Sequence, residues 1–460
     1  MRALIFPILV CQVLACNKSS SSSDDTTGPE RNGKPVSSDS TDYLDLAPDI
    51  SDDGENVVFL SGRTSHSGSL RSYRFNSSDK SLERLTDLST GHEVQVKISP
   101  DGGTVIILTI DESGTKKVFV QDLLVPSTRI EVPTNLKSLE LMGFSPENST
   151  VFGLIGNNSD NNPSFEVVSI AKSGSVISIN SVLEVSGMEV TESLPTWVSN
   201  GGSPGVVTKK VSSGTTSFVF RPVNGNGVFG ESVTSLGASS SLGVVLGVDM
   251  VASTSSLFYT EKLLSENSYE PDGDKVEKVQ VYPYQRVRGL SFDGETLTSL
   301  DYKLLSVSGY SASRSGNLVM FGLDSFSCEG ANQDITGQSL YLTNSSQASQ
   351  KIMIYDTYTP SGSSSSREIV TSSFCSKFDL TKSGAEQLAD FQITSVALAN
   401  NDSSWIMAIQ SWHRGDDEIY LVSFDWDGVN IDNIIFTNVS NNQKEGVALR
   451  GPFSYPKKSD

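Results

Sequence analysis

Short apolar stretches alternate with turn residues along almost the whole chain. One stretch, Val57–Leu60, follows the turn Ser-Asp-Asp-Gly at 51–54, and another, Val105–Leu108, follows Ser-Pro-Asp-Gly at 99–102. β-branched and aromatic side chains fill these stretches, while Gly, Asp, Asn and Ser separate them, which is typical of antiparallel hairpins. No segment shows the sustained 3.6-residue periodicity of a long helix. The pattern therefore predicts an all-β protein.

The hairpin pattern recurs seven times. The turn residues Gly54, Gly102 and Asn148 mark the first three copies, and later copies begin near Leu194, Leu246, Ser306 and Thr394. Further strands between the copies give each unit about four short strands, which is typical of a β-propeller blade. A single blade cannot bury both of its faces, whereas a ring of blades can. We therefore expect a β-propeller of four-stranded antiparallel blades, with seven blades favoured and six or eight as alternatives.

The first residues have the pattern of an export signal. Arg2 precedes the apolar run Ala3–Leu14, which is shorter than the roughly 20 residues needed to span a bilayer but suits the core of a signal peptide. Ala15 and Cys16 end the run, and a Ser/Asp-rich stretch follows. This arrangement resembles a bacterial lipoprotein signal, and the resemblance implies lipidation of Cys16 after removal of residues 1–15. An ordinary secreted protein cleaved near Ala15 is the alternative.

The chain is thus expected to have three parts. Residues 1–15 would be the lipoprotein signal peptide, 16–42 a flexible tether, and 43–460 the propeller. The string Ile-Ser-Pro-Asp-Gly at 98–102, followed by the apolar residues 105–107, resembles the repeat of TolB-type propellers, which are similar to WD-repeat proteins. Leu85-Thr86, Ile419-Tyr420-Leu421 and Phe436-Thr437-Asn438 add to this resemblance, which is weakest in units four to six.

Charge and cysteine content narrow the possible partners and the compartment. The chain has 54 acidic and 34 basic residues and a net charge of −20, which argues against nucleic-acid binding. Of its four cysteines, Cys11 would leave with the signal and Cys16 would carry the lipid. The remaining pair, Cys328 and Cys375, is expected to form a disulfide in an exported protein, with two buried free thiols as the alternative. Both lie in the segment 324–392, which we expect to be an insertion in unit six that carries recognition.

Few residues indicate chemistry. The segment Gly225–Gly230 matches Gly-x-Gly-x-x-Gly, but its place among hairpins favours a turn over a dinucleotide site. The acidic turns are likewise explained by turn formation better than by calcium binding. His66, His92 and His413 are predicted to occupy loops on one face, where a three-histidine metal site is conceivable and scattered loop histidines are the favoured alternative. No cofactor is expected.

Three aromatic residues have two possible roles. Tyr358, Trp412 and Trp426 could stack on a sugar or contact a peptide, or they could pack within blades.

The sequence as a whole favours a binding function over catalysis. No Gly-x-Ser-x-Gly segment joins a predicted strand to a predicted helix, as a nucleophile elbow would, and no catalytic residue is assigned. We expect a lipid-anchored scaffold for protein interaction or assembly in the bacterial envelope, most simply at the outer membrane, on either its periplasmic or its surface side. Its partner would be an envelope protein or a glycan. The alternative is a lyase or hydrolase acting on polysaccharide, or a glycan-binding protein, with its site at the propeller channel.

Overall fold

The structure is a computed structural model and describes much of the second of two units into which the chain divides, Met1–Thr41 and Asp42–Asp460. The described residues are 45–62, 69–86, 91–125, 129–174, 176–185, 192–200, 203–212, 215–230, 234–238, 243–247, 252–253, 256–263, 285–291, 306–312, 318–326, 335–344, 347–357, 366–370, 392–399, 405–413, 416–427 and 431–439. Within these ranges the regular elements are all β-strands, and no helix long and apolar enough to cross a membrane occurs there.

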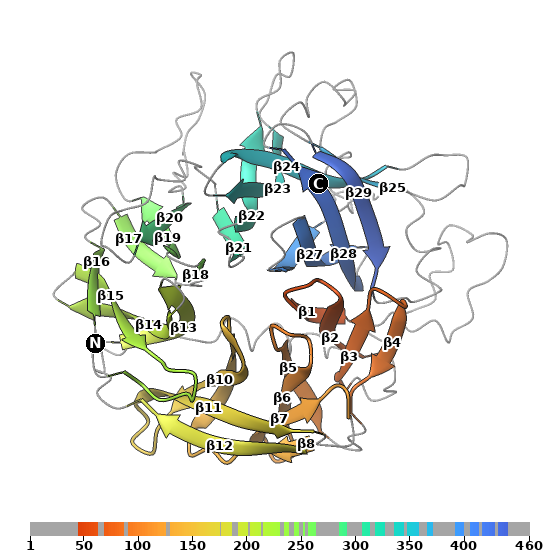
Figure 1. The fold of residues 1–460 in the computed structure, drawn as a ribbon. Helices are drawn as coiled ribbons and strands as arrows, with labels where there is room; N and C mark the ends of the chain where they lie inside the picture. The colour runs from red at the N-terminus through yellow and green to blue at the C-terminus, as the bar shows by residue number, and fades with distance from the viewer. Residues whose placement is uncertain are drawn as a thin grey trace, which may run out of the picture. The chain divides into compact units, whose positions relative to one another are not determined.

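The strands form seven antiparallel sheets (Figure 1). The first two sheets contain β1 (Asp45–Ile50), β2 (Asn56–Ser61), β3 (Arg71–Asn76) and β4 (Ser81–Arg84), then β5 (His92–Ile98), β6 (Thr104–Ile110), β7 (Lys116–Asp122) and β8 (Arg129–Glu131). The next two contain β9 (Lys137–Ser145), β10 (Asn148–Asn157), β11 (Pro163–Ser173) and β12 (Val176–Glu184), then β13 (Glu192–Asn200), β14 (Ser203–Ser212), β15 (Thr215–Pro222) and β16 (Thr234–Ala238).

Of the last three sheets, the fifth and the seventh have four strands and the sixth has five. The fifth contains β17 (Gly243–Gly247), β18 (Ala252–Ser253), β19 (Ser256–Leu263) and β20 (Gln285–Ser291). The sixth contains β21 (Ser306–Ala312), β22 (Leu318–Phe326), β23 (Ile335–Asn344), β24 (Gln347–Thr357) and β25 (Ser366–Val370). The seventh contains β26 (Gln392–Leu398), β27 (Trp405–His413), β28 (Asp416–Trp426) and β29 (Ile431–Asn438).

These sheets confirm the expected β-propeller of four-stranded antiparallel blades. Five sheets have four strands in simple sequential order, each strand paired with the next along the chain. In the fifth sheet β19 pairs with β17, β18 and β20, and the sixth sheet has five strands. Sequence likeness to the repeat is weakest in this same part of the chain, so the irregular pattern there reflects a less regular sheet.

The hydrophobic core lies between neighbouring sheets. Each sheet contacts the next, and β1 contacts β26, β27 and β28, so the contacts run in a closed circuit from the first sheet to the last. One buried cluster joins the first and seventh sheets through residues such as Phe59, Phe75 and Ile419. Other clusters join sheets one and two, two and three, three and four, and six and seven. Both faces of a blade are buried in this way, which is the physical reason for the ring.

The first strand of each sheet shows at least one register shift against its neighbour, with three in β9. Register shifts of this kind occur in β1, β5, β9, β13, β17, β21 and β26. In β5 the shift falls between Glu93 and Gln95. A bulge of this kind changes which side chains face the core, because side chains of a strand alternate with a period of two.

The described part of the segment 324–392, which we expected to be an insertion, consists of strands. Three strands, β23, β24 and β25, lie inside it and extend the sixth sheet. Runs such as Leu340–Leu342 and Ile352–Ile354 provide the β-branched, apolar and aromatic side chains that a paired strand requires. Cys328 and Cys375 lie outside the described residues, so the disulfide stays a prediction.

Candidate interaction surface

The turns between first and second strands are built by the repeated Ser-x-Asp-Gly motif. Ser51 Oγ donates to Asp53 Oδ1 at 2.5 Å and accepts the Asn56 amide at 3.0 Å. In the next sheet Ser99 Oγ donates to Asp101 Oδ1 at 2.6 Å and accepts from the Thr104 amide at 2.9 Å. The hydroxyl and carboxylate groups are therefore used within the turn, as the sequence predicted.

Lys172 contributes to the electrostatics of one of these turns. Burial alone would raise the pKa of Asp101, but hydrogen bonds from Ser99 and the Gly103 amide, together with Lys172, hold that pKa below its usual value. The carboxylate is therefore ionised near neutral pH, and its negative charge is compensated locally.

Hydrogen bonds also connect turns of consecutive sheets. The Asp52 amide donates to the Pro100 carbonyl at 2.9 Å, and the Asp101 amide donates to Ser149 Oγ at 3.0 Å. These contacts fix the turns of the first three sheets relative to one another.

The turns between third and fourth strands present apolar side chains to solvent. Five large apolar residues stand out as exposed among the described side chains, and three of them belong to these turns in consecutive sheets. They are Leu124 at 85% exposure, Val176 at 59% and Val228 at 44%. Single exposed apolar residues are common, but one in or at the end of the same connection in each of three adjacent sheets forms a pattern.

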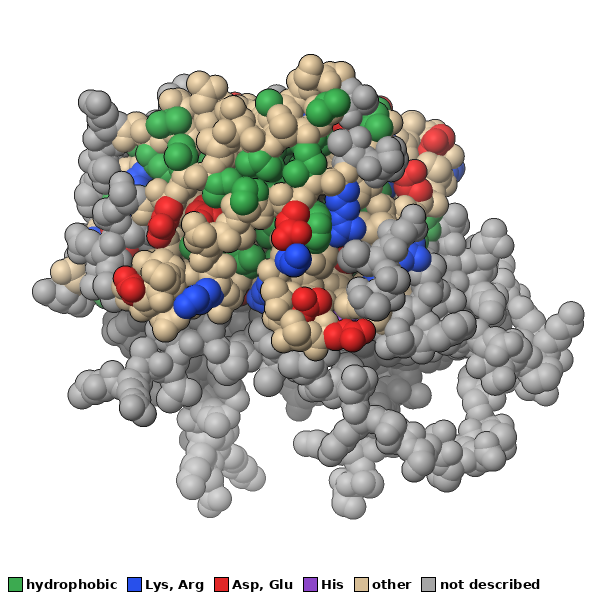
Figure 2. Space-filling model, turned by 90° about the horizontal axis from the view of Figure 1, so that it is seen from below, with side chains coloured by type: hydrophobic (Ala, Val, Ile, Leu, Met, Phe, Trp, Pro, Cys, Tyr) green, Lys and Arg blue, Asp and Glu red, His purple; other side chains and the backbone are tan. Residues whose placement is uncertain are grey.

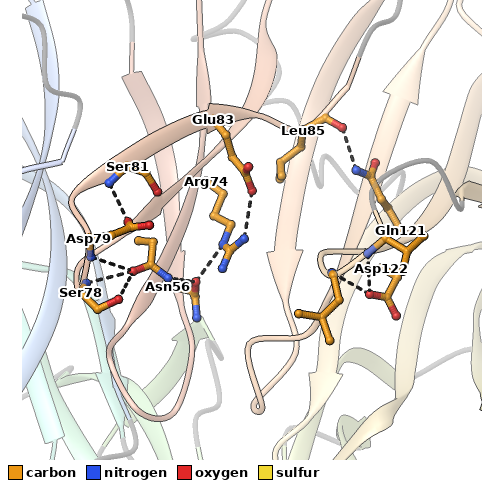
Figure 3. A network of polar contacts seen from close by, with 12 residues as sticks. Asn56, Arg74, Ser78, Asp79, Ser81, Glu83, Leu85, Gln121 and Asp122 are labelled. Atoms are coloured by element: carbon orange, nitrogen blue, oxygen red, sulfur yellow. Dashed lines mark hydrogen bonds and ion pairs between the residues drawn. The ribbon is translucent and has the colours of Figure 1, made fainter. Parts of the chain in front are cut away.

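Asp122 holds the turn that carries Leu124. Its Oδ1 atom accepts the backbone amides of Leu124 at 2.7 Å and Val125 at 3.2 Å, an arrangement that fixes the backbone after β7. Figure 3 shows Asp122 beside Gln121, whose Nε2 atom donates to the Leu85 carbonyl of the preceding sheet at 2.8 Å. The apolar side chain thus projects from a backbone that is anchored at two points.

The other two turns are fixed in a similar way. Asn224 Oδ1 accepts the amides of Asn226 and Val228, each at 3.0 Å, and Gly227 has a φ of +81° that favours glycine. Gly174, with a φ of +60°, precedes Val176 in the turn before β12. The Asn224 contacts therefore order the backbone next to Val228.

Contacts between sheets link the elements that carry these residues. Lys172 Nζ on β11 lies 3.9 Å from Asp122 Oδ2, linking the Leu124 turn to the hairpin that carries Val176. Further along β12, Ser181 donates to the carbonyl of Asn226, two residues before Val228, at 3.5 Å. We call Leu124, Val176 and Val228 the apolar turn surface.

On the outer side of the second and third sheets, hydrophobic side chains are separated from charged ones. Figure 2 views the molecule from the side where β8 and β12 lie in Figure 1. Hydrophobic side chains gather in the upper half of this view, with most charged side chains below and beside them. An apolar area bordered by charge is typical of surfaces that bind another protein.

A polar network lies in the sheet next to Leu124. Arg74 donates to Glu83 Oε1 at 3.0 Å and to Asn56 Oδ1 at 2.8 Å, as Figure 3 shows. Asp79 accepts the Ser81 amide at 2.9 Å in the turn that leads into β4. The first sheet is therefore polar where the second, third and fourth expose apolar residues.

Buried carboxylates lie at or near the start of three first strands, at Asp45, Glu93 and Glu192, and sequence reasoning missed them; the contacts of the last two are clear. Glu93 accepts the Ser72 amide at 2.5 Å and the Thr86 hydroxyl. Glu192 forms a two-bond ion pair with Arg221, with N–O distances of 2.7 and 2.8 Å, and also accepts from Thr208. These oxygens bond to donors within and between sheets, so both carboxylates hold the fold together.

The predicted histidine site is only partly described. His92 begins β5 and is exposed, and His413 ends β27, where the register places it opposite Asp416. His66 lies outside the described residues, so the three-histidine metal site stays a prediction. Among the residues whose positions are described, no three potential metal ligands come together.

Gly225–Gly230 and Trp426, for which the sequence left a structural role open, both have a structural role in the described residues. Gly225–Gly230 forms the turn after β15, as predicted. Trp426 is buried on β28 and packs edge-on against Trp405, with ring centroids 5.4 Å apart, so it is a blade-packing residue. Trp412 lies within β27, and Tyr358 and Cys16 lie outside the described residues.

Comparison with known proteins yields similar folds only. No protein-family model matches the chain, and no curated protein matches it. The β-propeller domain of the Trilobed protease from Pyrococcus furiosus is 10% identical over 87% of this chain and 98% of that one, with a TM-score of 0.48. A putative TolB from Agrobacterium tumefaciens is 17% identical over 57% and 81%, with a TM-score of 0.35. An oligogalacturonate lyase from Vibrio parahaemolyticus is 11% identical over 83% and 90%, with a TM-score of 0.46. These names describe the activities of those proteins alone.

Proposed function

We propose that the chain is an exported, lipid-anchored β-propeller that binds another protein in the bacterial cell envelope. Cys16 would attach it to the membrane, most simply the outer membrane, and residues 17–42 would hold the ring at a distance from the lipid. The apolar turn surface would contact the partner.

The observation that carries this proposal is the repeated exposure of apolar side chains on fixed turns. Leu124, Val176 and Val228 occupy equivalent turns of consecutive sheets, and hydrogen bonds or a left-handed glycine fix each backbone. Less conformational entropy would be lost on binding, because hydrogen bonds already hold the backbone next to Leu124 and Val228. A partner that covers these side chains gains about 25 cal/mol of binding free energy for each Å² of apolar surface removed from water.

Site-specific photocrosslinking in cells tests this proposal. A photoreactive amino acid is placed singly at positions 124, 176 and 228 of the full anchored chain, and at the exposed Glu112 as the matched control. Glu112 lies in the turn between β6 and β7, at the other end of the second sheet from Leu124. We expect one envelope protein to crosslink from all three surface positions and not from position 112.

The opposite result would point to another function. No protein crosslink from any of the three positions, or equal crosslinking from position 112, would contradict the proposal. Depolymerisation of envelope or extracellular polysaccharide by the purified ring would then support the enzymatic alternative.

A further inference from the structure

Arg129, the first residue of β8, is a half-buried arginine with unused hydrogen-bond donors. Its Nε and Nη2 atoms are buried and have no hydrogen-bond partner among the described residues. The arginines that are buried more deeply are bonded, since Arg221 pairs with Glu192 and Arg71 donates to two backbone carbonyls. Unpaired donors of a buried charged group are costly, so an acceptor from another molecule would stabilise this part of the ring.

The two acidic side chains that act on the charge of Arg129 are bonded to other groups. They are Glu93 and Glu131, and burial outweighs their effect and lowers the pKa of Arg129 below its ordinary value. Glu93 accepts a backbone amide of β3 at 2.5 Å and the Thr86 hydroxyl, and Glu131 pairs with Lys117 at 3.1 Å. Neither carboxylate bonds to Nε or Nη2. The described part of the chain therefore leaves this edge of the guanidinium without an acceptor.

Packing orients the guanidinium of Arg129 between the first two sheets. Its central carbon Cζ lies 3.8 Å from the centre of the Phe119 ring, and this contact holds the group over the ring. Arg129 lies opposite Gln121 in the register, and Gln121 Nε2 donates to the Leu85 carbonyl of the first sheet at 2.8 Å. Side chains at opposite positions of paired strands share a face, so Arg129 also faces the first sheet. Because β8 is the outer strand of its sheet, this position is at the rim of the ring.

We propose that Arg129 binds the carboxylate group of a ligand at the rim between the first and second sheets. The N–H bonds of Nε and Nη2 point in parallel from one edge of the guanidinium, and the two oxygens of a carboxylate accept such a pair. Arg129 and Phe119 are each partly exposed, so the site adjoins solvent. The net charge of −20 opposes binding of a long polyanion, which favours a ligand with a single carboxylate. This inference does not depend on the proposed function.

Thermal unfolding of the purified full chain tests this inference with acetate as the probe. Sodium chloride at equal ionic strength and neutral pH provides the comparison. We expect acetate to raise the unfolding midpoint by about 2–5 °C relative to chloride, and we expect the rise to level off with concentration, as binding to one site requires. A general effect of the salt on hydration of the protein surface would continue to increase with concentration.

Three substitutions separate a carboxylate site from a general effect of charge. Arg129→Met keeps an unbranched side chain over Phe119 but removes the donors, so it should abolish the acetate response without lowering stability in chloride. Arg129→Lys keeps the positive charge but lacks the paired donors, and it should retain at most a small part of the response. Arg74→Met is the matched control, because it removes an arginine that is already bonded to Glu83 and Asn56, and it should keep the response. Should Arg129→Met fail to fold, the lysine variant provides the comparison.

Three results would overturn the inference. One is an acetate response that is absent from wild type or equal in wild type and Arg129→Met, and another is a full response in Arg129→Lys. The third is a large loss of stability of Arg129→Met in chloride, which would show that the chain itself provides an acceptor for the guanidinium.

Crosslinking in cells identifies the source of the carboxylate. Position 124 lies in the connection between β7 and β8, which ends at Arg129. If Arg129→Met abolishes the protein crosslink from position 124, the carboxylate belongs to an acidic side chain of the partner. If the crosslink persists while the purified chain responds to acetate, the ligand is a free carboxylate. A response to acetate without any protein crosslink in wild type would reject the proposed function and keep this site.

Discussion

Buried charges show how individual residues are constrained by the ring. Glu192 and Arg221 are each less than a tenth exposed, and they satisfy one another with two hydrogen bonds. Desolvating two charges is costly, and only their mutual attraction and the Thr208 contact offset that cost. Removing one partner of the pair should therefore lower the free energy of unfolding more than removing both.

A double-mutant cycle measures this coupling. Arg221→Met should lower the free energy of unfolding by about 3–5 kcal/mol, because it leaves the Glu192 carboxylate buried without its partner. Glu192→Leu combined with Arg221→Met should cost much less than the two single changes added together. Urea unfolding of the four proteins checks this, and additive costs would contradict it.

A second buried carboxylate predicts a pH dependence. Burial raises the pKa of Glu166 above its ordinary value of 4.5, although Thr134 and the Asn135 amide donate to it. The folded state therefore binds this proton more tightly than the unfolded state does. Its contribution to stability is fully present below pH 4.5 and is lost as pH rises through the raised pKa.

Glu166→Gln should remove this dependence. The stability of the variant relative to wild type should increase as pH rises from 4.5, because only the wild type loses stability by ionising a buried group. Thermal unfolding at a series of pH values measures the difference. A difference that is constant or decreases with pH would show that Glu166 ionises without cost.

At the scale of elements, turn glycines couple neighbouring sheets. Gly102 has a φ of +70°, and a Cβ atom there would come within 2.8 Å of Asn56 Nδ2 in the preceding sheet. Gly114 has a similar φ of +83°, but a Cβ atom at that position meets nothing within 4 Å. Both glycines have a left-handed backbone that another residue would strain. Only at Gly102 would the added Cβ atom also meet a neighbouring sheet.

Alanine substitution separates these two effects. Gly114→Ala should cost about 1 kcal/mol of unfolding free energy from the left-handed backbone alone. Gly102→Ala should cost clearly more, because the polar contacts of Asn56 must also shift. Chemical denaturation of both variants gives the comparison, and equal costs would show that the turn does not depend on contact between sheets.

The elements that sequence patterns predicted best are those with regular repeats. The turns at 51–54 and 99–102, and the strands around them, follow from residue type alone, because Ser, Asp and Gly are each required by the turn geometry. The fifth and sixth sheets depart from this rule.

The buried acids could not be predicted from alternation. In β5 the alternation of Val94, Val96 and Ile98 would place Glu93 on the polar side with Gln95. The extra residue between Glu93 and Gln95 reverses this parity and turns the carboxylate into the interior. The apolar turn surface was missed for another reason, since exposure of a turn residue depends on packing between sheets.

At the scale of the whole molecule, the ring closes by contact between its first and last sheets. The Ala47 amide donates to Gln410 Oε1 at 2.8 Å, a bond between residues 363 positions apart. Ala47 lies at the bulge of β1, so the extra residue there also serves closure. The first and last sheets are thereby joined by a side-chain hydrogen bond as well as by core packing.

Membrane attachment should depend on one thiol. Cys16→Ser should remove the site of lipidation, so the protein should no longer incorporate labelled fatty acid and should leave the membrane fraction. Cell fractionation and labelling in the native host measure this, with Cys11→Ser as the matched control that keeps both properties. Retention of the fatty acid in Cys16→Ser would exclude this residue as the anchor.

The most direct test of the central claim is quantitative crosslinking of a surface variant in cells. The variant combines Leu124→Ser, Val176→Ser and Val228→Ser, and the control is Val211→Ser, which changes an exposed valine at the end of β14. Both should fold, since the changed side chains are exposed. The account predicts that the triple variant loses its crosslinked protein partner while the control keeps it. Equal recovery of that partner by both proteins would contradict the account.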